Sequence, residues 1–222
     1  MSRGVRKWLV RIPLFLIAAS ILVVLLLRWV PVRFTPLMLK RACQFREDTS
    51  YHREQHWVPL EDMSPDLIKA VLLCEDIKFY GHHGFDWPAI RWTWRHRHER
   101  QLTGCSTISQ QTAKNVFTFG SRTVFRKALE AWWTVLIEWI WGKQRILEVY
   151  LNVAEMGRGI YGIGAATEHY YFVPPSDISE SQAVALALSL PRPLVSDPLA
   201  VSDRVRMKYI LGELKLVQFS PK

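Results

Sequence analysis

The sequence has few cysteines, and they are not spaced as ligands. Cys43, Cys74 and Cys105 lie far apart and form no Cys-x-x-Cys or Cys/His pattern, which argues against a structural zinc site or a disulfide framework. We expect them to fill small apolar spaces. His82 and His83 are expected to be loop or packing residues, because adjacent side chains point apart and no carboxylate is spaced to complete a ligand set.

Internal repeats, low-complexity tracts and long Pro/Gly linkers are missing after about residue 33, so we expect one domain there. Strand-like alternation of apolar and polar residues is almost absent. The 222 residues are 49% hydrophobic and carry a net charge of +9, which suits one packed domain plus an apolar segment and excludes a disordered chain. A mainly α fold is predicted.

The one long hydrophobic run lies at the N-terminus. Residues 12–27 contain no charge, basic residues precede them and Arg28-Trp29 follows. As a helix the run covers roughly 24 Å, and flanking tryptophans and snorkelling arginines extend it to bilayer thickness. A cleaved signal peptide is the competing interpretation, but no small-x-small cleavage site follows. By the positive-inside rule we expect a basic cytoplasmic tail at 1–11, a transmembrane anchor at 12–32 and a domain outside the inner membrane at 33–222.

Helix signals dominate the rest of the chain. Ser64-Pro65-Asp66 has the pattern of a helix start, and the segments 107–110 and 177–180 each match a capping box. A long helix is expected from 123 to 141 with Gly142 ending it. The last helix carries apolar residues at helical spacing: Met207, Ile210, Leu211 and Leu214.

The stretch EDIKFYGHHGFD, beginning at Glu75, places a carboxylate on an apolar row. Glu75 is in helical register with Ile68 and Leu72, and Phe79 follows one turn later. Desolvation at such a position would raise the proton affinity of the carboxylate, which suits a general base.

A second polar segment, GCSTISQQTAKN, opens a predicted helix. Gln110 and Lys114 are four residues apart, as are Gln111 and Asn115, so one flank presents amides and an ammonium group. Taken alone, these residues would form a solvated surface. The preceding loop offers free backbone N–H groups at the helix start, however, and this geometry often binds an anion. The spacing of a nucleotide P-loop is absent.

The stretch SRTVFRKALE adds Arg122, Arg126, Lys127 and Glu130. Its ordinary interpretation is an exposed Arg126–Glu130 pair, which would contribute only about 0.3 to 0.5 kcal/mol. Together with Lys114, however, four cations gather near one helix start with a single nearby acid. This balance suits a substrate that carries two phosphate charges.

In order and spacing, EDIKFYGHHGFD, GCSTISQQTAKN, RKALE, KQRILEVYLN and GRGIYGIGAATEHYYF resemble the five signature blocks of the peptidoglycan glycosyltransferases, the polymerase family of the penicillin-binding proteins. The SxxK and KTG patterns of a penicillin-binding transpeptidase are absent, so the chain resembles the monofunctional, single-pass members of the Gram-negative inner membrane. The resemblance implies a lysozyme-like α-helical glycosyltransferase domain with a smaller, membrane-associated jaw lobe.

The resemblance further implies polymerisation of lipid II into peptidoglycan strands. The growing chain would pass, with inversion, from undecaprenyl pyrophosphate to the C4 hydroxyl of the acceptor's N-acetylglucosamine. Glu75 would be the catalytic base and Glu130 the second important carboxylate, while Glu148 and Arg158 would hold the site together. The residues that the resemblance assigns to substrate binding are Lys114, Arg122, Arg126, Lys127, Ser106, Gln110, Gln111, Asn115, Asp76 and Phe79.

Expected partners are lipid II, the lipid-linked glycan, membrane lipids and proteins of cell-wall synthesis or division. No cofactor or metal-binding residue is required by the sequence, although Mg²⁺ or Mn²⁺ could stimulate the reaction. The basic aromatic stretch at 91–101 would in isolation suggest nucleic acid. Behind an anchor, we expect it to contact anionic lipid headgroups instead, with Val116, Phe117 and Phe119 entering the bilayer.

Two other classes of protein remain open. A lysozyme-like peptidoglycan hydrolase or lytic enzyme would also place a Glu in a sugar cleft, but its substrate has no pyrophosphate at the scissile bond for the cations to bind. A non-catalytic membrane scaffold would use the basic surface, but it leaves Glu75 on an apolar row unexplained.

Overall fold

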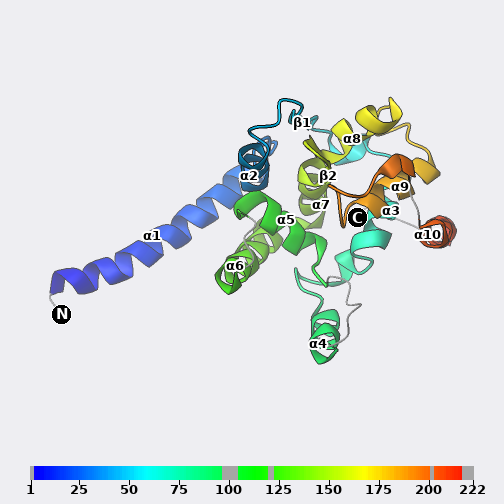
Figure 1. Ribbon diagram of the computed structural model, residues 1–222. Helices are drawn as coiled ribbons and strands as arrows, with labels where there is room; N and C mark the ends of the chain where they lie inside the picture. Colours follow the sequence, from blue (N-terminus) through cyan, green and yellow to red (C-terminus); the bar gives the residue numbers. More distant parts are fainter. Residues whose placement is uncertain (1–2, 97–104, 120–122, 201–202, 217–222) are drawn as a thin grey trace.

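The computed structural model describes residues 3–96, 105–119, 123–200 and 203–216, with side chains described from residue 7 onward. The chain is mainly helical, as predicted, with one long helix extending from a body of shorter helices (Figure 1). The elements are α1 (Arg3–Leu27), α2 (Pro36–Gln44), β1 (Glu54–Gln55), η1 (Leu60–Asp62), α3 (Pro65–Glu75), η2 (Phe79–Gly81), α4 (Trp87–Arg95), α5 (Ile108–Phe117), α6 (Val124–Ile140), α7 (Gly142–Val153), β2 (Glu155–Gly157), β3 (Ile160–Tyr161), α8 (Gly162–Tyr171), α9 (Glu180–Ser189), η3 (Pro198–Ala200) and α10 (Arg204–Leu216).

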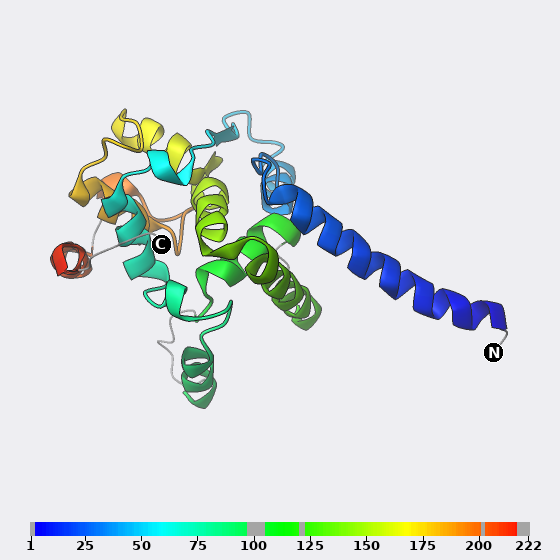
Figure 2. The same cartoon turned by 180° about the vertical axis from the view of Figure 1, so that it is seen from behind.

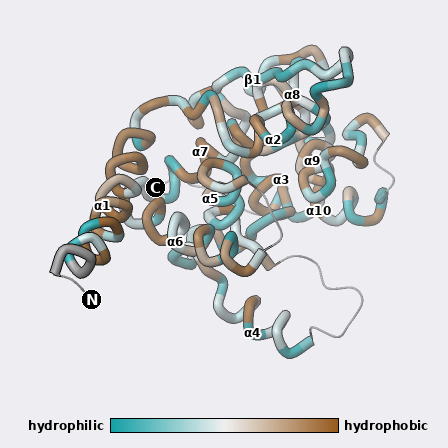
Figure 3. The backbone as a smooth tube through the Cα atoms, turned by 60° about the vertical axis from the view of Figure 1, so that its left-hand side comes forward, coloured by the Kyte–Doolittle hydropathy of each residue, from teal (hydrophilic) through white to brown (hydrophobic). Residues whose placement is uncertain are grey.

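The N-terminal apolar run forms α1, which projects away from the body in both views (Figures 1 and 2). Its segment Lys7–Leu27 is long and apolar enough to cross a membrane, and hydrophobic residues predominate along it (Figure 3). The helix ends at Leu27, five residues before the end of the expected anchor at 12–32, because a turn begins at Arg28. At its other end the helix begins at Arg3, so α1 also contains most of the expected basic tail at 1–11.

The C-terminal half of α1 packs against the body. The Trp141 indole donates a hydrogen bond to the Val24 carbonyl at 2.7 Å, and the Trp132 indole lies 3.3 Å from Ser20 Oγ. Arg145 of α7 donates to the carbonyl of Leu27 at 2.9 Å. These contacts orient α1 relative to the domain.

The core forms where α3 packs between α9 and α10, and where α5 packs on α6 and α7. The apolar row predicted for α3 is buried, including Ile68 and Leu72. In α10, Ile210 and Leu214 are buried, and Met207 packs against the core. The periodicity of both helices therefore predicted their buried faces correctly.

Two helix starts carry complete capping boxes. Thr107 and Gln110 form the one predicted at the start of α5. The second prediction was wrong by two residues: α9 begins at Glu180, so Ser179 is the N-cap and its partner is Gln182. Ser64 occupies the N-cap position of α3, but its side chain makes no capping hydrogen bond.

The described residues contain a three-stranded sheet of very short strands, in the order β1-β3-β2, with β1 parallel and β2 antiparallel to β3. At the turn into α8, Gly162 has φ +77°, and a Cβ there would lie 2.4 Å from the Asn152 carbonyl oxygen. Only glycine fits this approach of α8 to the end of α7.

Two expectations about individual side chains were wrong. Val116 is buried and Phe117 stacks on Trp133 with ring centroids 4.3 Å apart, because this face of α5 packs against α6 instead of entering a bilayer. Phe119 is exposed. Cys43 is exposed and fills no apolar space, whereas Cys74 is half-buried.

Candidate functional site

Glu75 is the last residue of α3 and is half-buried. Its Oε2 accepts a hydrogen bond of 2.7 Å from Nε2 of Gln111, on α5. Burial raises the pKa of Glu75, while the Gln111 hydrogen bond and the charges of Arg206 and Lys114 act in the opposite direction. The carboxylate is thus partly desolvated, with an amide donor of α5 and charged groups of α5 and α10 acting on it.

Asp76 fixes the helix that faces Glu75. Its Oδ2 accepts from the backbone N–H of Ile108 at 2.9 Å and lies 3.0 Å from Nε2 of His82. The Ile108 N–H is one of the groups at the start of α5 that have no acceptor within the helix itself. By accepting from it, Asp76 also places negative charge at the positive end of the helix dipole. Asp76, which follows the candidate base in the chain, therefore joins the end of α3 directly to the start of α5.

Lys114 lies two-thirds of the way along α5 and is half-buried. Burial lowers the pKa of this ammonium group, the charge of Glu130 opposes that effect, and Glu75 opposes it more weakly. Within the described part of the chain, the ammonium group forms neither a hydrogen bond nor an ion pair. An anion entering the site would therefore find a partly desolvated cation between two carboxylates.

Glu130 is buried at 2% exposure on α6 and forms two ion pairs. Arg126 Nη1 and Lys127 Nζ each lie 2.5 Å from one of its carboxylate oxygens. The Arg126–Glu130 pair is present, as the ordinary interpretation of the sequence predicts, but its acid is buried instead of exposed. One carboxylate thus holds two cations on the side of α6 near Lys114.

The predicted substrate-binding residues divide by burial. Lys114, Gln111, Ser106 and Arg126 are half-buried and Lys127 is exposed. Arg122 lies outside the described residues. The side chains expected to contact substrate but found in the interior are Asp76, Phe79, Gln110 and Asn115.

For these four interior residues, contact with the substrate stays a prediction. Asp76 and Gln110 are engaged at the start of α5, the latter in the capping box. Phe79 is 1% exposed beneath the ammonium group of Lys143, whose Nζ lies 4.4 Å from the ring centroid. Asp76 and Gln110 thus hold the start of α5, the helix whose Gln111 bonds Glu75.

Glu148 and Arg158 form ion pairs away from Glu75. Glu148 pairs with Arg145 at 3.2 Å, the same arginine that bonds the end of α1. Arg158 pairs with Asp48 and lies over the Phe45 ring, 4.5 Å from its centroid. The Glu148 pair lies within α7, whereas the contacts of Arg158 join segments that are distant in sequence.

Sequence reasoning missed several residues around the site. Tyr150 of α7 donates its hydroxyl to Oε1 of Gln111 at 3.3 Å. Arg206 of α10 acts electrostatically on both Cys74 and Glu75. Tyr150 could have been found, because it lies in the KQRILEVYLN block. Arg206 could not, because no local sequence pattern indicates that α10 packs near the end of α3.

A buried ion pair lies on the α2 side of α5. Arg41 of α2 contacts Glu155 Oε2 through Nε at 3.0 Å and Nη2 at 2.9 Å. Burial raises the pKa of Glu155, the Arg41 contact opposes this rise, and the charge of Lys114 opposes it less. The pair adds to the polar surroundings of Lys114.

The neighbouring thiol of Cys74 narrows the possible chemistry. Burial raises the pKa of the Cys74 thiol to about 12, so this cysteine is a neutral thiol and not a nucleophile at neutral pH. Among the described residues, no three His, Cys, Asp or Glu side chains are grouped as a metal site. A carboxylate of raised pKa beside an unpaired ammonium group suits proton removal from a substrate whose departing part is an anion.

Comparison with known proteins agrees with this chemistry. The family model described as Transglycosylase matches residues 29–215. A protein of Bdellovibrio bacteriovorus named biosynthetic peptidoglycan transglycosylase is 45% identical over 193 residues, covering 85% of this chain and 76% of the relative. Proteins of the same name from Stutzerimonas stutzeri and Yersinia pseudotuberculosis are 46% and 42% identical, covering 87% and 86% of this chain and 81% and 82% of the relatives.

Proposed function

The chain belongs to the transglycosylase family and is a peptidoglycan glycosyltransferase, and from this premise we propose that it polymerises lipid II into glycan strands with inversion at the transferred carbon. The observation that carries the proposal is the half-buried Glu75, bonded by Gln111 and influenced by the charge of Lys114, an ammonium group with no ion pair among the described residues. The donor would be the growing chain on undecaprenyl pyrophosphate, and the acceptor would be the C4 hydroxyl of a second lipid II.

Glu75 is the base in the proposed step. The acceptor hydroxyl gives its proton to the carboxylate while its oxygen bonds to the anomeric carbon of the donor, and the bond from that carbon to the pyrophosphate oxygen breaks. Burial favours the role because it raises the proton affinity of Glu75, while the opposing hydrogen bond keeps the carboxylate available as a base. Attack on the face opposite the leaving group accounts for inversion.

The cations assist the leaving group. Pyrophosphate departs with its own negative charge, so fixed positive groups, rather than an acid, stabilise it in the transition state. Lys114 has no ion pair among the residues that the structure describes, and Glu130 holds Arg126 and Lys127 nearby with half of their combined charge balanced before the substrate arrives. Glu130 thereby acts as the second important carboxylate.

The alternative of a peptidoglycan hydrolase is less well supported. Hydrolysis of a neutral glycosidic bond normally needs a carboxylic acid to protonate the leaving oxygen. Glu130, the second buried carboxylate of the site, is occupied by two cations and is poorly placed to donate a proton. A purely structural scaffold gives no reason for keeping Lys114 desolvated and unpaired.

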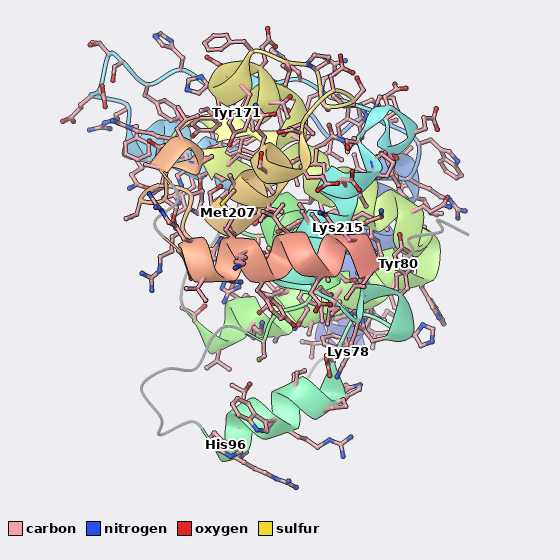
Figure 4. The ribbon with its side chains drawn as sticks, turned by 90° about the vertical axis from the view of Figure 1, so that its right-hand side faces the viewer. Lys78, Tyr80, His96, Tyr171, Met207 and Lys215 are labelled. Carbon is pink, nitrogen blue, oxygen red and sulfur yellow. The ribbon has the colours of Figure 1, made fainter. Side chains whose placement is uncertain are left out.

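We infer that the enzyme is anchored in the inner membrane with its domain in the periplasm. The helix Lys7–Leu27 provides the anchor, and α6 contacts it. Exposed apolar side chains on α6 include Phe125 and Trp139, at 72% and 87% exposure. On α4, which stands apart from the body (Figure 4), Trp94 is also exposed. These surfaces suit an enzyme whose substrates stay in the lipid phase.

Further partners follow from the proposed reaction. Proteins of cell-wall synthesis or division would use the glycan strand after it forms. A divalent cation such as Mg²⁺ or Mn²⁺ could stimulate turnover by binding the pyrophosphate, and adding a chelator to the assay tests this effect.

Replacing the proposed base tests the function. Glu75→Gln keeps the size of the side chain but cannot take a proton, so polymerisation should fall about 10²- to 10⁴-fold. The measurement is strand formation from purified lipid II in detergent, with Glu61→Gln, an exposed acid on η1, as the matched control. Full turnover in the Glu75 variant would refute the assignment of the base.

A further inference from the structure

The amide of Gln111 is held in one orientation by three neighbours. Its Nε2 lies 2.7 Å from Glu75 Oε2 and 3.5 Å from the Ser106 carbonyl oxygen, while its Oε1 accepts from the Tyr150 hydroxyl at 3.3 Å. The two acceptors, Glu75 Oε2 and the Ser106 carbonyl, therefore face the amide nitrogen, and the Tyr150 hydroxyl, which donates, faces the amide oxygen. Turning the amide over would place two oxygens against each other at the Glu75 and Ser106 contacts, and it would remove the acceptor that the Tyr150 hydroxyl now bonds.

Tyr150 is held in place as a hydrogen-bond donor to Gln111. It lies on α7 at 1% exposure, so its ring is fixed in the core. Burial raises the pKa of this phenol well above its usual range, and the charge of Glu75 adds to the rise. The hydroxyl is therefore protonated throughout the pH range in which the enzyme works.

We propose that Tyr150 is a positioning residue for glycosyl transfer: its hydroxyl fixes the Gln111 amide so that the amide nitrogen bonds one oxygen of Glu75, and the other oxygen takes the acceptor proton. The inference rests on the proposed function, because that function makes Glu75 the base. Gln111 is one of the predicted site residues, whereas Tyr150 entered the sequence analysis only within a signature block.

The contact has a consequence for the ionisation of Glu75. The Gln111 hydrogen bond lowers the pKa of Glu75 against the larger effect of burial. An amide released from Tyr150 can present its oxygen to the carboxylate, which disfavours the charged form. The other groups that act on Glu75 are Arg206 of α10, Lys114 of α5 and Asp76 at the end of α3.

The test removes only the hydroxyl. In the full-length enzyme, Tyr150→Phe should move the acidic limb of the kcat/KM profile to higher pH, because a larger share of Glu75 is then protonated. It should also lower kcat/KM at neutral pH about two- to tenfold, the effect of one neutral hydrogen bond. Tyr161→Phe is the control: it is equally buried, and its hydroxyl lies 3.4 Å from that of Tyr51.

A double variant separates positioning from general loss of stability. Gln111→Leu should move the acidic limb in the same direction, and adding Tyr150→Phe to it should produce no further shift. Additive shifts, or an unmoved limb in Tyr150→Phe accompanied only by a lower Tm, would overturn the proposal.

A direct titration keeps this proposal separate from the proposed function. The ¹³C signal of the Glu75 carboxyl, identified by its loss in Glu75→Gln, reports the pKa of Glu75 with no substrate present. A higher pKa of Glu75 in Tyr150→Phe than in the unmodified enzyme supports the positioning role even if lipid II is not polymerised. An unchanged pKa contradicts the role even if polymerisation is observed.

Discussion

At the scale of single residues, the site depends on opposing influences on one carboxylate. Burial raises the pKa of Glu75, and a hydrogen bond from α5 and charges from α5 and α10 limit the rise. The sequence predicted the acid and Lys114 because both stand at unusual places in helical patterns. It could not predict Arg206, because that contact depends on how α10 packs on α3, which no local pattern encodes.

Removing Arg206 should change the pH dependence of catalysis. Its positive charge lowers the pKa of Glu75, so Arg206→Ala raises that pKa. The base acts only when deprotonated, and the acidic limb of kcat/KM therefore moves to higher pH. The measurement is polymerisation rate against pH at low salt, where the charge is least screened.

Lys208→Ala provides the matched control, because Lys208 is exposed on the same helix. If the acidic limb of kcat/KM moves equally in Arg206→Ala and Lys208→Ala, the shift is a general effect of net charge. A limb that stays in place in Arg206→Ala would show that Arg206 does not act on the base.

At the scale of elements, the important junction is between the end of α3 and the start of α5. Periodicity and capping signals located both helices, because long apolar patterns and Thr107–Gln110 are local features. The second capping box was misplaced, since two overlapping segments near residue 179 fit the same pattern. The two- and three-residue strands were not predicted, because segments this short show no alternation.

Asp76→Ala should weaken this junction. The substitution leaves the Ile108 N–H and the His82 ring without their shared acceptor, so the free energy of unfolding should fall by about 1–3 kcal/mol. Urea unfolding in detergent measures the loss, and hydrogen exchange should become faster at the first amides of α5.

The control for this junction is Asp177→Ala, because Asp177 is exposed and its carboxylate contacts Ser176 Oγ. Equal stability of the Asp76 variant and the unmodified protein would show that the carboxylate does not join the two helices.

At the scale of the whole molecule, α1 projects from the helical domain but is attached to it by its C-terminal half (Figure 1). Trp141, Trp132 and Arg145 bond the C-terminal half of α1 and the residues after it. The sequence predicted an anchor from its length and charge, but not this packing, because the contacts join residues more than a hundred positions apart. The apolar side chains of α6 consequently lie beside the anchor.

The exposed apolar face of α6 should matter only for membrane-borne substrate. Phe125→Ser with Trp139→Ser should raise the KM several-fold for lipid II in vesicles, because less apolar surface enters the bilayer. The KM for a water-soluble, short-chain analogue should not change. Tyr209→Ser, an exposed change on α10, is the control, and equal losses with both substrates would assign the face of α6 a structural role instead.

The most direct test of the account is the fate of lipid II and of finished glycan when each is incubated with the purified, full-length chain. We expect β-linked strands to accumulate from lipid II, with one undecaprenyl pyrophosphate released for each bond formed, and finished glycan to remain intact. Cleavage of finished glycan without any strand formation would contradict the account, because the carboxylate proposed as the base would then serve hydrolysis.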